Sequence, residues 1–229
     1  MKGAKPLRVL ELFAGQRCVG KAFERYGHEV FSIDYDKQHP NINWYVDIGD
    51  ISATDIRIRF GLPDIIWASP DCSTYSIAAI SHHRTREPCG NLAPKSDYAL
   101  TCDRVNQHLL HLIRELNPVY WFIENPRGGM RKMNFMKELP RYTITYCQYG
   151  DERMKPTDIW ANHPNPRFKP MCKNGDPCHV SAPRGSKTGT QGRKGAVERA
   201  LIPDGLCNHI VEICMEGVLI DTNKGSITI

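Results

Sequence analysis

The sequence contains no long apolar segment. Its longest strongly apolar stretch, Pro118–Ile123, is far too short to cross a bilayer. Met1–Leu7 carries two lysines but no cleavage-site pattern, and the chain shows no internal repeat or low-complexity tract. We therefore expect neither a membrane association nor a signal peptide. The 229 residues suffice for one good-sized domain, or for one domain with a small appendage.

The nine cysteines lack the pattern of a disulfide framework. Their number is odd and they are spread along the chain. Without an export signal, this predicts a cytoplasmic protein with reduced thiols, in a bacterial or phage-infected cell. Hydrophobic residues at 41% and charged residues at 24% exclude wholesale disorder.

Positive charge is concentrated in one segment. Residues 161–199 hold eight basic and two acidic residues, so this segment carries +6 while the whole chain carries +5. It shows no helical or strand period and is rich in Pro and Gly. A solvated loop is one interpretation. We favour a phosphate-binding surface, because the accompanying Gly, Ser and Thr leave backbone N–H groups free to contact an anion.

Short apolar strands alternate with helices over the first two-thirds of the chain. The patterns predict strands at Arg8–Phe13, Glu29–Asp34, Asp64–Ser69 and Val119–Glu124, and helices at Cys18–Tyr26, Tyr98–Leu116 and Asp204–Gly217. This alternation predicts an α/β fold with a doubly wound, mostly parallel sheet. In such a sheet, ligands bind beyond the carboxyl ends of the strands.

Motifs at the ends of the first two strands suit a nucleoside cofactor. Gly15 follows Phe13 at a strand–helix turn, where backbone can approach a ligand closely; an ordinary turn would look the same. Asp34 and Tyr35 end the second strand, where a carboxylate can accept ribose hydroxyls and an aromatic ring can stack on a base. The dipeptide Asp47–Ile48 could read an adenine amino group. Each acid taken alone could equally be an ordinary surface residue.

Two further strand ends carry candidate catalytic groups. Cys72 lies in the loop Ser69–Ser73, where a cysteine can act as a nucleophile if its pKa is lowered, although most lone cysteines are structural. Glu124 follows five apolar residues and precedes Asn125–Pro126. Burial there can raise its pKa and let it share a proton with a base ring.

In this order, the motifs resemble those of the DNA cytosine-5 methyltransferases. The matching segments are LFAG at Leu12–Gly15, VFSIDYD at Val30–Asp36, SPDCSTYS at Ser69–Ser76, ENP at Glu124–Pro126 and YGDERMKPTDIW at Tyr149–Trp160. They correspond to the family's cofactor motifs, nucleophile loop, acidic motif and basic motif, and the chain from Arg199 onward resembles the last motif. The resemblance covers residues 7–160 and 196–216.

The resemblance implies a Rossmann-like class I methyltransferase fold that binds S-adenosylmethionine. Its cofactor-binding residues would be Phe13, Gly15, Asp34, Tyr35, Asp47, Ile48 and Pro70. The Cys72 thiolate would add to C6 of a flipped-out cytosine, and Glu124 would hold N3 and the exocyclic amine. Lys155 and Arg153 would assist in positioning the base.

The resemblance also implies a double-stranded DNA substrate. The expected DNA contacts are Ser76, Arg84, Asn125, Thr157, Arg184, Lys187, Arg193 and Lys194. We expect a catalytic and cofactor-binding domain at residues 1–160, a reduced, basic target-recognition insert at 161–195 and a C-terminal helix returning at 196–229. The enzyme would be a compact monomer of the kind that phages carry.

Two alternatives stay open. Arg17 and Cys18 stand where the family has a glycine pair, which would fit a catalytically silent DNA-binding homologue that keeps the fold. The Cys72 and Glu124 pair would equally serve an enzyme of the same fold that uses another one-carbon donor or acts on RNA.

The remaining cluster is Cys172, Cys178 and His179. Zinc usually takes four ligands, and the sequence offers three here, with His163 as a candidate fourth. A structural zinc site is one interpretation, and a loop without metal is the one we favour.

Overall fold

A seven-stranded sheet forms the centre of the computed structural model, which describes residues 5–88, 90–181 and 195–224. The strand order is β3-β2-β1-β4-β7-β9-β8. The strands are β1 (Arg8–Leu12), β2 (Glu29–Asp34), β3 (Trp44–Tyr45), β4 (Ile65–Ala68), β7 (Tyr120–Pro126), β8 (Arg141–Thr145) and β9 (Pro156–Ala161). The first five are parallel, and β9 runs antiparallel to both β7 and β8. This order confirms the expected doubly wound, Rossmann-like methyltransferase fold.

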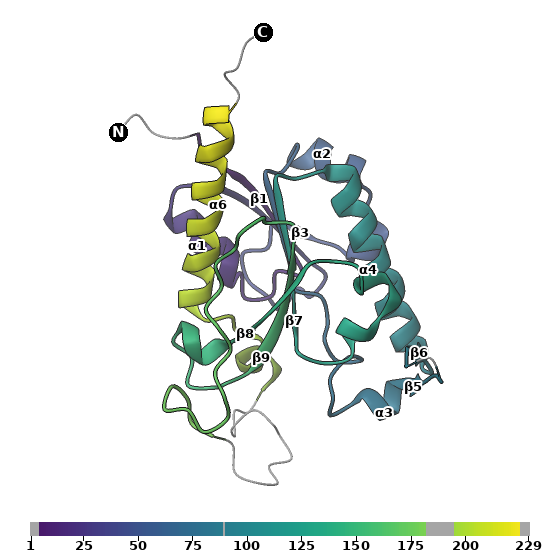
Figure 1. Ribbon diagram of the computed structural model, residues 1–229. Helices are drawn as coiled ribbons and strands as arrows, with labels where there is room; N and C mark the ends of the chain where they lie inside the picture. The colour runs from purple at the N-terminus through teal and green to yellow at the C-terminus, as the bar shows by residue number, and fades with distance from the viewer. Residues whose placement is uncertain (1–4, 89, 182–194, 225–229) are drawn as a thin grey trace.

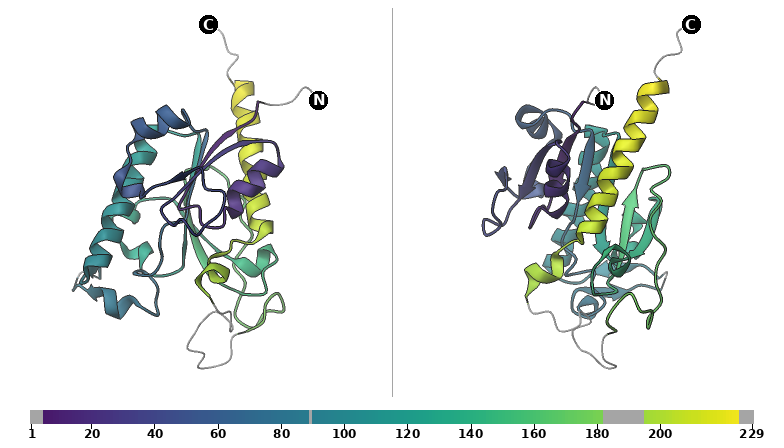
Figure 2. Two further views of the ribbon diagram at one scale, coloured as in Figure 1. Left: turned by 180° about the vertical axis from the view of Figure 1, so that it is seen from behind. Right: turned by 90° about the vertical axis from the view of Figure 1, so that its left-hand side faces the viewer.

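Helices cover both faces of the sheet (Figure 1 and Figure 2). On one face lie α1 (Cys18–Arg25) and α6 (Asp204–Lys224), and on the other lie α2 (Ala53–Arg59) and α4 (Asp97–Leu116). The shorter elements are α3 (Ile80–His83), α5 (Ala196–Ala200), the antiparallel pair β5 (Arg84–Arg86) and β6 (Leu92–Pro94), and the 3-10 turns η1 (Ile48–Asp50), η2 (Met130–Lys132), η3 (Asn134–Met136) and η4 (Tyr146–Tyr149).

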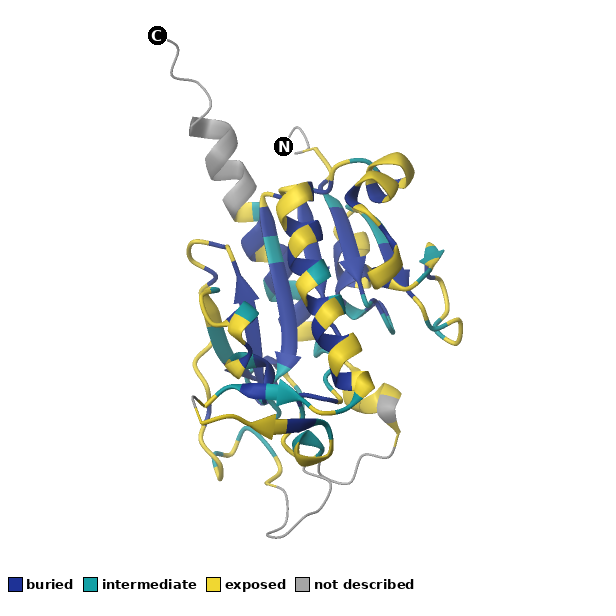
Figure 3. Ribbon diagram, turned by 90° about the vertical axis from the view of Figure 1, so that its right-hand side faces the viewer, coloured by how far each residue is buried: buried dark blue, intermediate teal, exposed yellow. Residues whose placement is uncertain are grey.

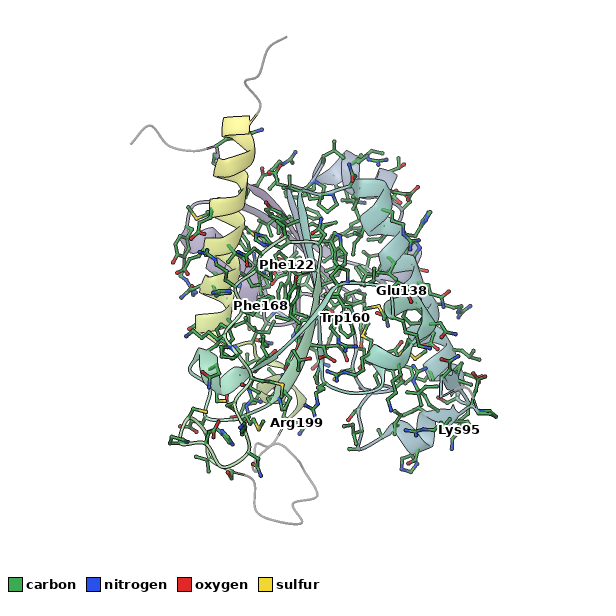
Figure 4. All side chains as sticks on the ribbon, viewed as in Figure 1. Lys95, Phe122, Glu138, Trp160, Phe168 and Arg199 are labelled. Atoms are coloured by element: carbon green, nitrogen blue, oxygen red, sulfur yellow. The ribbon has the colours of Figure 1, made fainter. Side chains whose placement is uncertain are left out.

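The central strands are apolar on both sides because a helix layer covers each face. All four residues of β4 are buried, and the strands are dark in Figure 3 while the outer helix faces are exposed. Figure 4 labels Phe122 and Trp160 inside the molecule. Phe122 belongs to the apolar cluster that includes α1 and α6, whereas Trp160 belongs to a second cluster, which includes α2 and α4.

Local signals set the ends of α4. The Ser96 hydroxyl accepts a hydrogen bond from the Ala99 N–H at 3.2 Å and caps the first turn. Asn117 adopts a left-handed conformation with φ 46°, and Pro118 follows it, so the helix ends where the sequence predicts. The C-terminal helix α6 begins at the predicted Asp204 and continues to Lys224.

Within the basic segment, residues 162–181 contain no helix or strand, whereas α5 lies at the end of the segment. The predicted DNA contacts Arg184, Lys187, Arg193 and Lys194 lie outside the described residues. Among the helices that the structure describes, none combines the length and apolarity needed to traverse a bilayer.

Candidate active site

A cavity of about 410 Å³ lies at the carboxyl ends of β1, β2, β4 and β7. Its size falls within the range of ordinary small-molecule sites. Predicted site residues that line it are Phe13, Gly15, Asp34, Tyr35, Pro70, Cys72, Glu124 and Lys155. Arg199 lines it as well, at the lower end of the molecule in Figure 4. The strand-end motifs therefore meet around one cavity.

The loops after β1 and β2 form one end of this cavity. Gly15 has φ 50°, a left-handed conformation that glycine adopts readily, and its N–H donates to Asp34 Oδ2 at 2.8 Å. The Asp36 N–H donates to the other oxygen, Asp34 Oδ1, at 2.9 Å. These two bonds fix the carboxylate and leave a second acceptor position on each oxygen. The neighbouring Tyr35 ring is 68% exposed and is available for stacking.

The pair predicted to recognise adenine, Asp47 and Ile48, forms the start of η1. The Asp47 carboxylate accepts the Gly49 N–H at 2.8 Å and caps η1. Ile48 is buried in the apolar core against α4. Neither residue lines the cavity. Asp47 is exposed and uses one carboxylate oxygen for this cap, so its role in adenine recognition stays a prediction.

Arg17 points away from the cavity although it replaces a glycine of the family pattern. Its Nε donates to the Ser32 hydroxyl at 2.9 Å, and its guanidinium forms an ion pair with Glu24. Cys18 is the residue of this pair that lines the cavity. The arginine therefore leaves the space for a cofactor open.

Glu11 is a cavity residue that the motif analysis missed. It lies within β1, is 2% exposed, and accepts hydrogen bonds from the Gly20 N–H and the Ser32 hydroxyl, both at 2.8 Å. Burial raises its pKa from 4.5 to about 7, partly offset by these two bonds and by Arg17. A Cβ on Gly20 would stand 2.3 Å from Glu11 Oε2, so a larger residue there would displace the Glu11 carboxylate. The sequence signal that could have identified Glu11 is an acidic residue between the apolar residues of β1.

The nucleophile loop is tied to the neighbouring strand. The Asn125 side-chain amide donates to the Pro70 carbonyl at 2.9 Å, and the N–H groups of Tyr75 and Ser76 donate to the Cys72 carbonyl at 3.0 and 2.9 Å. Burial, reinforced by Glu124 and Asp71, raises the pKa of Cys72 to about 11, while Lys155 lowers it. The thiol is therefore protonated at neutral pH in this state of the protein.

Glu124 is buried at the end of β7. The Tyr146 hydroxyl donates to Glu124 Oε1 at 2.9 Å. Burial raises the pKa of Glu124, while Lys155, Tyr146 and Ser69 act to lower it. This agrees with the expectation that burial raises the pKa at this position.

Lys155 supplies positive charge beside these groups. Its Nζ donates to the Arg199 carbonyl at 3.0 Å and stands 4.4 Å from the centroid of the Tyr146 ring. Burial lowers the pKa of Lys155, and Glu124 opposes that shift. Its backbone is left-handed, with φ 28°, at the residue before β9. The lysine is thus held between the acid and the C-terminal segment.

Arg153 and Arg84 are engaged inside the protein rather than available to a substrate. The Arg153 guanidinium binds Asp151, with Nε 2.9 Å from Oδ1, and does not line the cavity. Arg84 is 4% exposed and pairs with Asp103, with Nη2 2.8 Å from Oδ1. The predicted phosphate contact of Arg84 is therefore wrong, because the guanidinium is part of the core.

Asn125 and Thr157 are also fully buried, contrary to the prediction of DNA contacts. Asn125 holds the nucleophile loop, and the Thr157 hydroxyl donates to the Lys155 carbonyl at 3.2 Å. Their side chains hold the backbone of the cavity residues Pro70 and Lys155. Ser76, the remaining described candidate, is half-buried.

The sulfur cluster lies outside the cavity and includes a residue that the sequence did not single out. Cys172, Cys178 and His179 meet Cys147, and the four ligand atoms lie within 4.8 Å of one another. His163 lies elsewhere, with its ring against Tyr120 and its Nε2 bonded to the Ile213 carbonyl.

The chain is similar to known methyltransferases. No family model matches the chain. The "Probable DNA (cytosine-5)-methyltransferase" of Frog virus 3 (isolate Goorha) is 27% identical in an alignment 227 residues long, which covers 91% of this chain and 100% of that protein. This match confirms the resemblance to cytosine-5 methyltransferases.

Solved structures that the chain resembles include methyltransferases from three organisms. Dnmt2 of S. pombe is 18% identical with a TM-score of 0.47, over 69% of this chain and 49% of that chain. A Spodoptera frugiperda DNMT2 mutant is 16% identical with a TM-score of 0.48, over 77% and 57%. The Entamoeba histolytica methyltransferase EhMeth is 15% identical with a TM-score of 0.49, over 76% and 55%. The chain spans about half the length of these three proteins.

Proposed function

We propose that this protein is an S-adenosylmethionine-dependent DNA cytosine C5-methyltransferase. The observation that carries the proposal is the shared cavity, which has Asp34 and Tyr35 at one end and Cys72 with Glu124 at the other. A methyl transfer between a nucleoside cofactor and a base needs both binding ends to open into one space. The viral relative supports cytosine as the base and DNA as the substrate.

The residues of the first end fit the cofactor. The oriented Asp34 carboxylate would hold the ribose hydroxyls, and Tyr35 would stack on the adenine. The left-handed turn at Gly15 brings backbone to the cavity wall, and Arg17 is turned away from it. When bound, S-adenosylmethionine supplies an electrophilic methyl group.

The second end would activate the cytosine. The Cys72 thiolate attacks C6, which makes C5 nucleophilic, and Glu124 holds N3 and the exocyclic amine. After methylation, C5 loses its proton and Cys72 leaves, which restores the aromatic ring. Because the negative charge of Glu124 helps to raise the pKa of Cys72, a proton shared between Glu124 and N3 removes one obstacle to thiolate formation.

The cytosine must leave the DNA stack to reach this cavity. Exposed basic residues near the nucleophile loop could hold the flanking phosphates: Arg86, Arg127 and Lys132 line a second cavity of about 290 Å³. These three residues replace the buried Arg84 as candidate DNA contacts. We also propose that the segment 161–195 is a reduced target-recognition insert that contacts DNA. We propose that the enzyme works as a monomer, and its viral relative supports a virus-borne or phage-borne origin.

A mechanism-based trap tests the proposal. DNA duplexes of randomised sequence that carry 5-fluorodeoxycytidine should form a covalent complex with the protein when S-adenosylmethionine is present, because fluorine cannot leave C5 as a proton does. Cys72→Ala should lose the complex but keep cofactor binding. Cys102→Ser on α4, outside the cavity, is the matched control and should keep both.

Two outcomes would contradict the proposal. Methyl transfer at the wild-type rate by Cys72→Ala would remove Cys72 as the nucleophile. A complex with RNA of matching sequence, in the absence of one with DNA, would favour the RNA alternative.

A further inference from the structure

The cluster outside the cavity has the composition of a metal site. Cys147 belongs to η4, while Cys172, Cys178 and His179 come from the segment 162–181. The Cys147 sulfur is 3.1 Å from that of Cys172 and 3.5 Å from that of Cys178. His179 Nδ1 is 3.7 Å from the Cys172 sulfur and 3.5 Å from the Cys178 sulfur. Within the described parts of the chain, no other group of this kind brings its ligand atoms together.

These distances suit four ligands around one ion. Zinc bound tetrahedrally at about 2.3 Å from sulfur and about 2.0 Å from nitrogen places neighbouring ligand atoms roughly 3.5–3.8 Å apart. Four of the six separations between ligand atoms are 3.1–3.7 Å and approach these values, and all six are at most 4.8 Å. A disulfide would join only two of the three sulfurs, and would leave the third sulfur and the imidazole without a role.

The backbone around the cluster is organised to present the ligands. The Cys172 N–H donates to the Thr145 hydroxyl at 3.1 Å, and the Lys169 N–H donates to the Tyr149 hydroxyl at 2.8 Å. The Val180 N–H donates to the Glu152 carbonyl at 3.0 Å. These bonds join a segment without helix or strand to η4 and to the residues on either side of it. Cys147, the fourth ligand, lies 25 residues before Cys172 in the chain, so local spacing did not reveal it.

We propose that Cys147, Cys172, Cys178 and His179 bind one structural zinc ion. Three thiolates and an imidazole form a soft donor set typical of zinc, and four protein ligands leave no open position for a substrate. Cys147 and Cys172 are buried, so the ion would be enclosed. It would fasten the segment 162–181 to the catalytic body.

The site also adjoins the catalytic acid. Cys147 follows Tyr146, whose hydroxyl bonds to Glu124. Metal binding at η4 would therefore fix the tyrosine that orients Glu124. This second consequence rests on the proposed function, whereas the zinc site itself does not.

The metal is measured first, on the full chain purified under reducing conditions. Elemental analysis should find about one zinc per chain, and replacement by Co²⁺ should give the intense visible bands of a tetrahedral thiolate site. Cys147→Ser should weaken zinc affinity by more than the roughly 10–100-fold that loss of an outer partner costs. Cys102→Ser should leave the metal content unchanged, because α4 lies apart from the cluster.

A ligand exchange guards against a variant that merely misfolds. His179→Cys should retain zinc and shift the Co²⁺ spectrum towards that of four thiolates. A histidine that only packs in a loop would give no such shift.

The proposed site would be overturned if wild-type protein with all thiols reduced contained no zinc and bound no Co²⁺. So would a disulfide between Cys147 and Cys172 in protein purified without oxidant. If the site holds zinc but the fluorocytosine trap fails, the metal inference stands and the proposed function falls.

Discussion

Glu11 should make the stability of the folded protein depend on pH. Its carboxyl group is enclosed by β1, β2 and α1, and burial raises its pKa from 4.5 to about 7. The folded protein therefore binds a proton more tightly than the unfolded chain, so this contribution to stability is complete below pH 4.5 and is lost as the pH rises through 7. At about 1.36 kcal/mol per pH unit, the loss between pH 5 and pH 8 is roughly 2–3 kcal/mol.

The isosteric change Glu11→Gln isolates this contribution. The amide keeps an oxygen for the Gly20 N–H but does not ionise, so the variant should gain roughly 2–3 kcal/mol relative to the wild type between pH 5 and pH 8. Urea unfolding of the cofactor-free proteins at several pH values measures the difference. Ser32→Ala removes a hydrogen bond that lowers this pKa, and it should move the loss of stability to higher pH. If the free energy of unfolding depended on pH in the same way for the wild type and Glu11→Gln, the reasoning would be refuted.

Three further predictions concern the site and its supports. Asp34→Ala should weaken S-adenosylmethionine binding by about 1–3 kcal/mol in calorimetry while DNA affinity is kept, and an unaltered cofactor affinity would place the ribose contact elsewhere. Arg84→Ala should cost about 3–5 kcal/mol of stability in urea unfolding, whereas the exposed Arg86→Ala should change it by less than about 0.5 kcal/mol and weaken DNA binding instead. Tyr146→Phe should raise the pKa of Glu124 further and move the pH–rate profile of methyl transfer upward, with cofactor affinity unchanged; an unshifted profile would show that their hydrogen bond does not tune the acid.

The central sheet could be predicted because parallel strands covered on both faces are nearly continuous apolar runs. β2 has the bounds that the sequence predicts, and β4 lies within its predicted range. The antiparallel strand β9 was not predicted separately, because it carries a buried charge. Asp158 interrupts its apolar pattern, and the cost of burying that charge is offset by an ion pair with Arg131. Such a partner, 27 residues away in the chain, cannot be found from local periodicity.

The location of the site followed from strand ends, but the assignment of individual side chains did not. Cys72 and Glu124 end or follow strands whose position in the sheet is fixed by burial, so their meeting at one cavity was predictable. Whether an arginine faces a phosphate or a buried carboxylate depends on distant residues. Asp103, on α4, draws Arg84 into the core from 19 residues away. For the same reason, the sequence did not show that Cys147 joins Cys172 and Cys178 in one cluster.

Beside Cys72 and Glu124 the positive charge comes from a lysine, although Arg199 also lines the cavity. Arg17, Arg84 and Arg153 each bind a carboxylate of the protein. Among the described residues, Lys155 lowers the pKa of Cys72 and also that of Glu124. Burial lowers the pKa of Lys155 itself, which lysine permits far more readily than arginine. The positive charge that favours the Cys72 thiolate therefore belongs to Lys155, which can itself lose its proton. An ionised Glu124 raises the pKa of Lys155 and so helps to keep this charge. As Glu124 accepts a proton, its effect of raising the pKa of Cys72 disappears, and so does its effect of raising the pKa of Lys155.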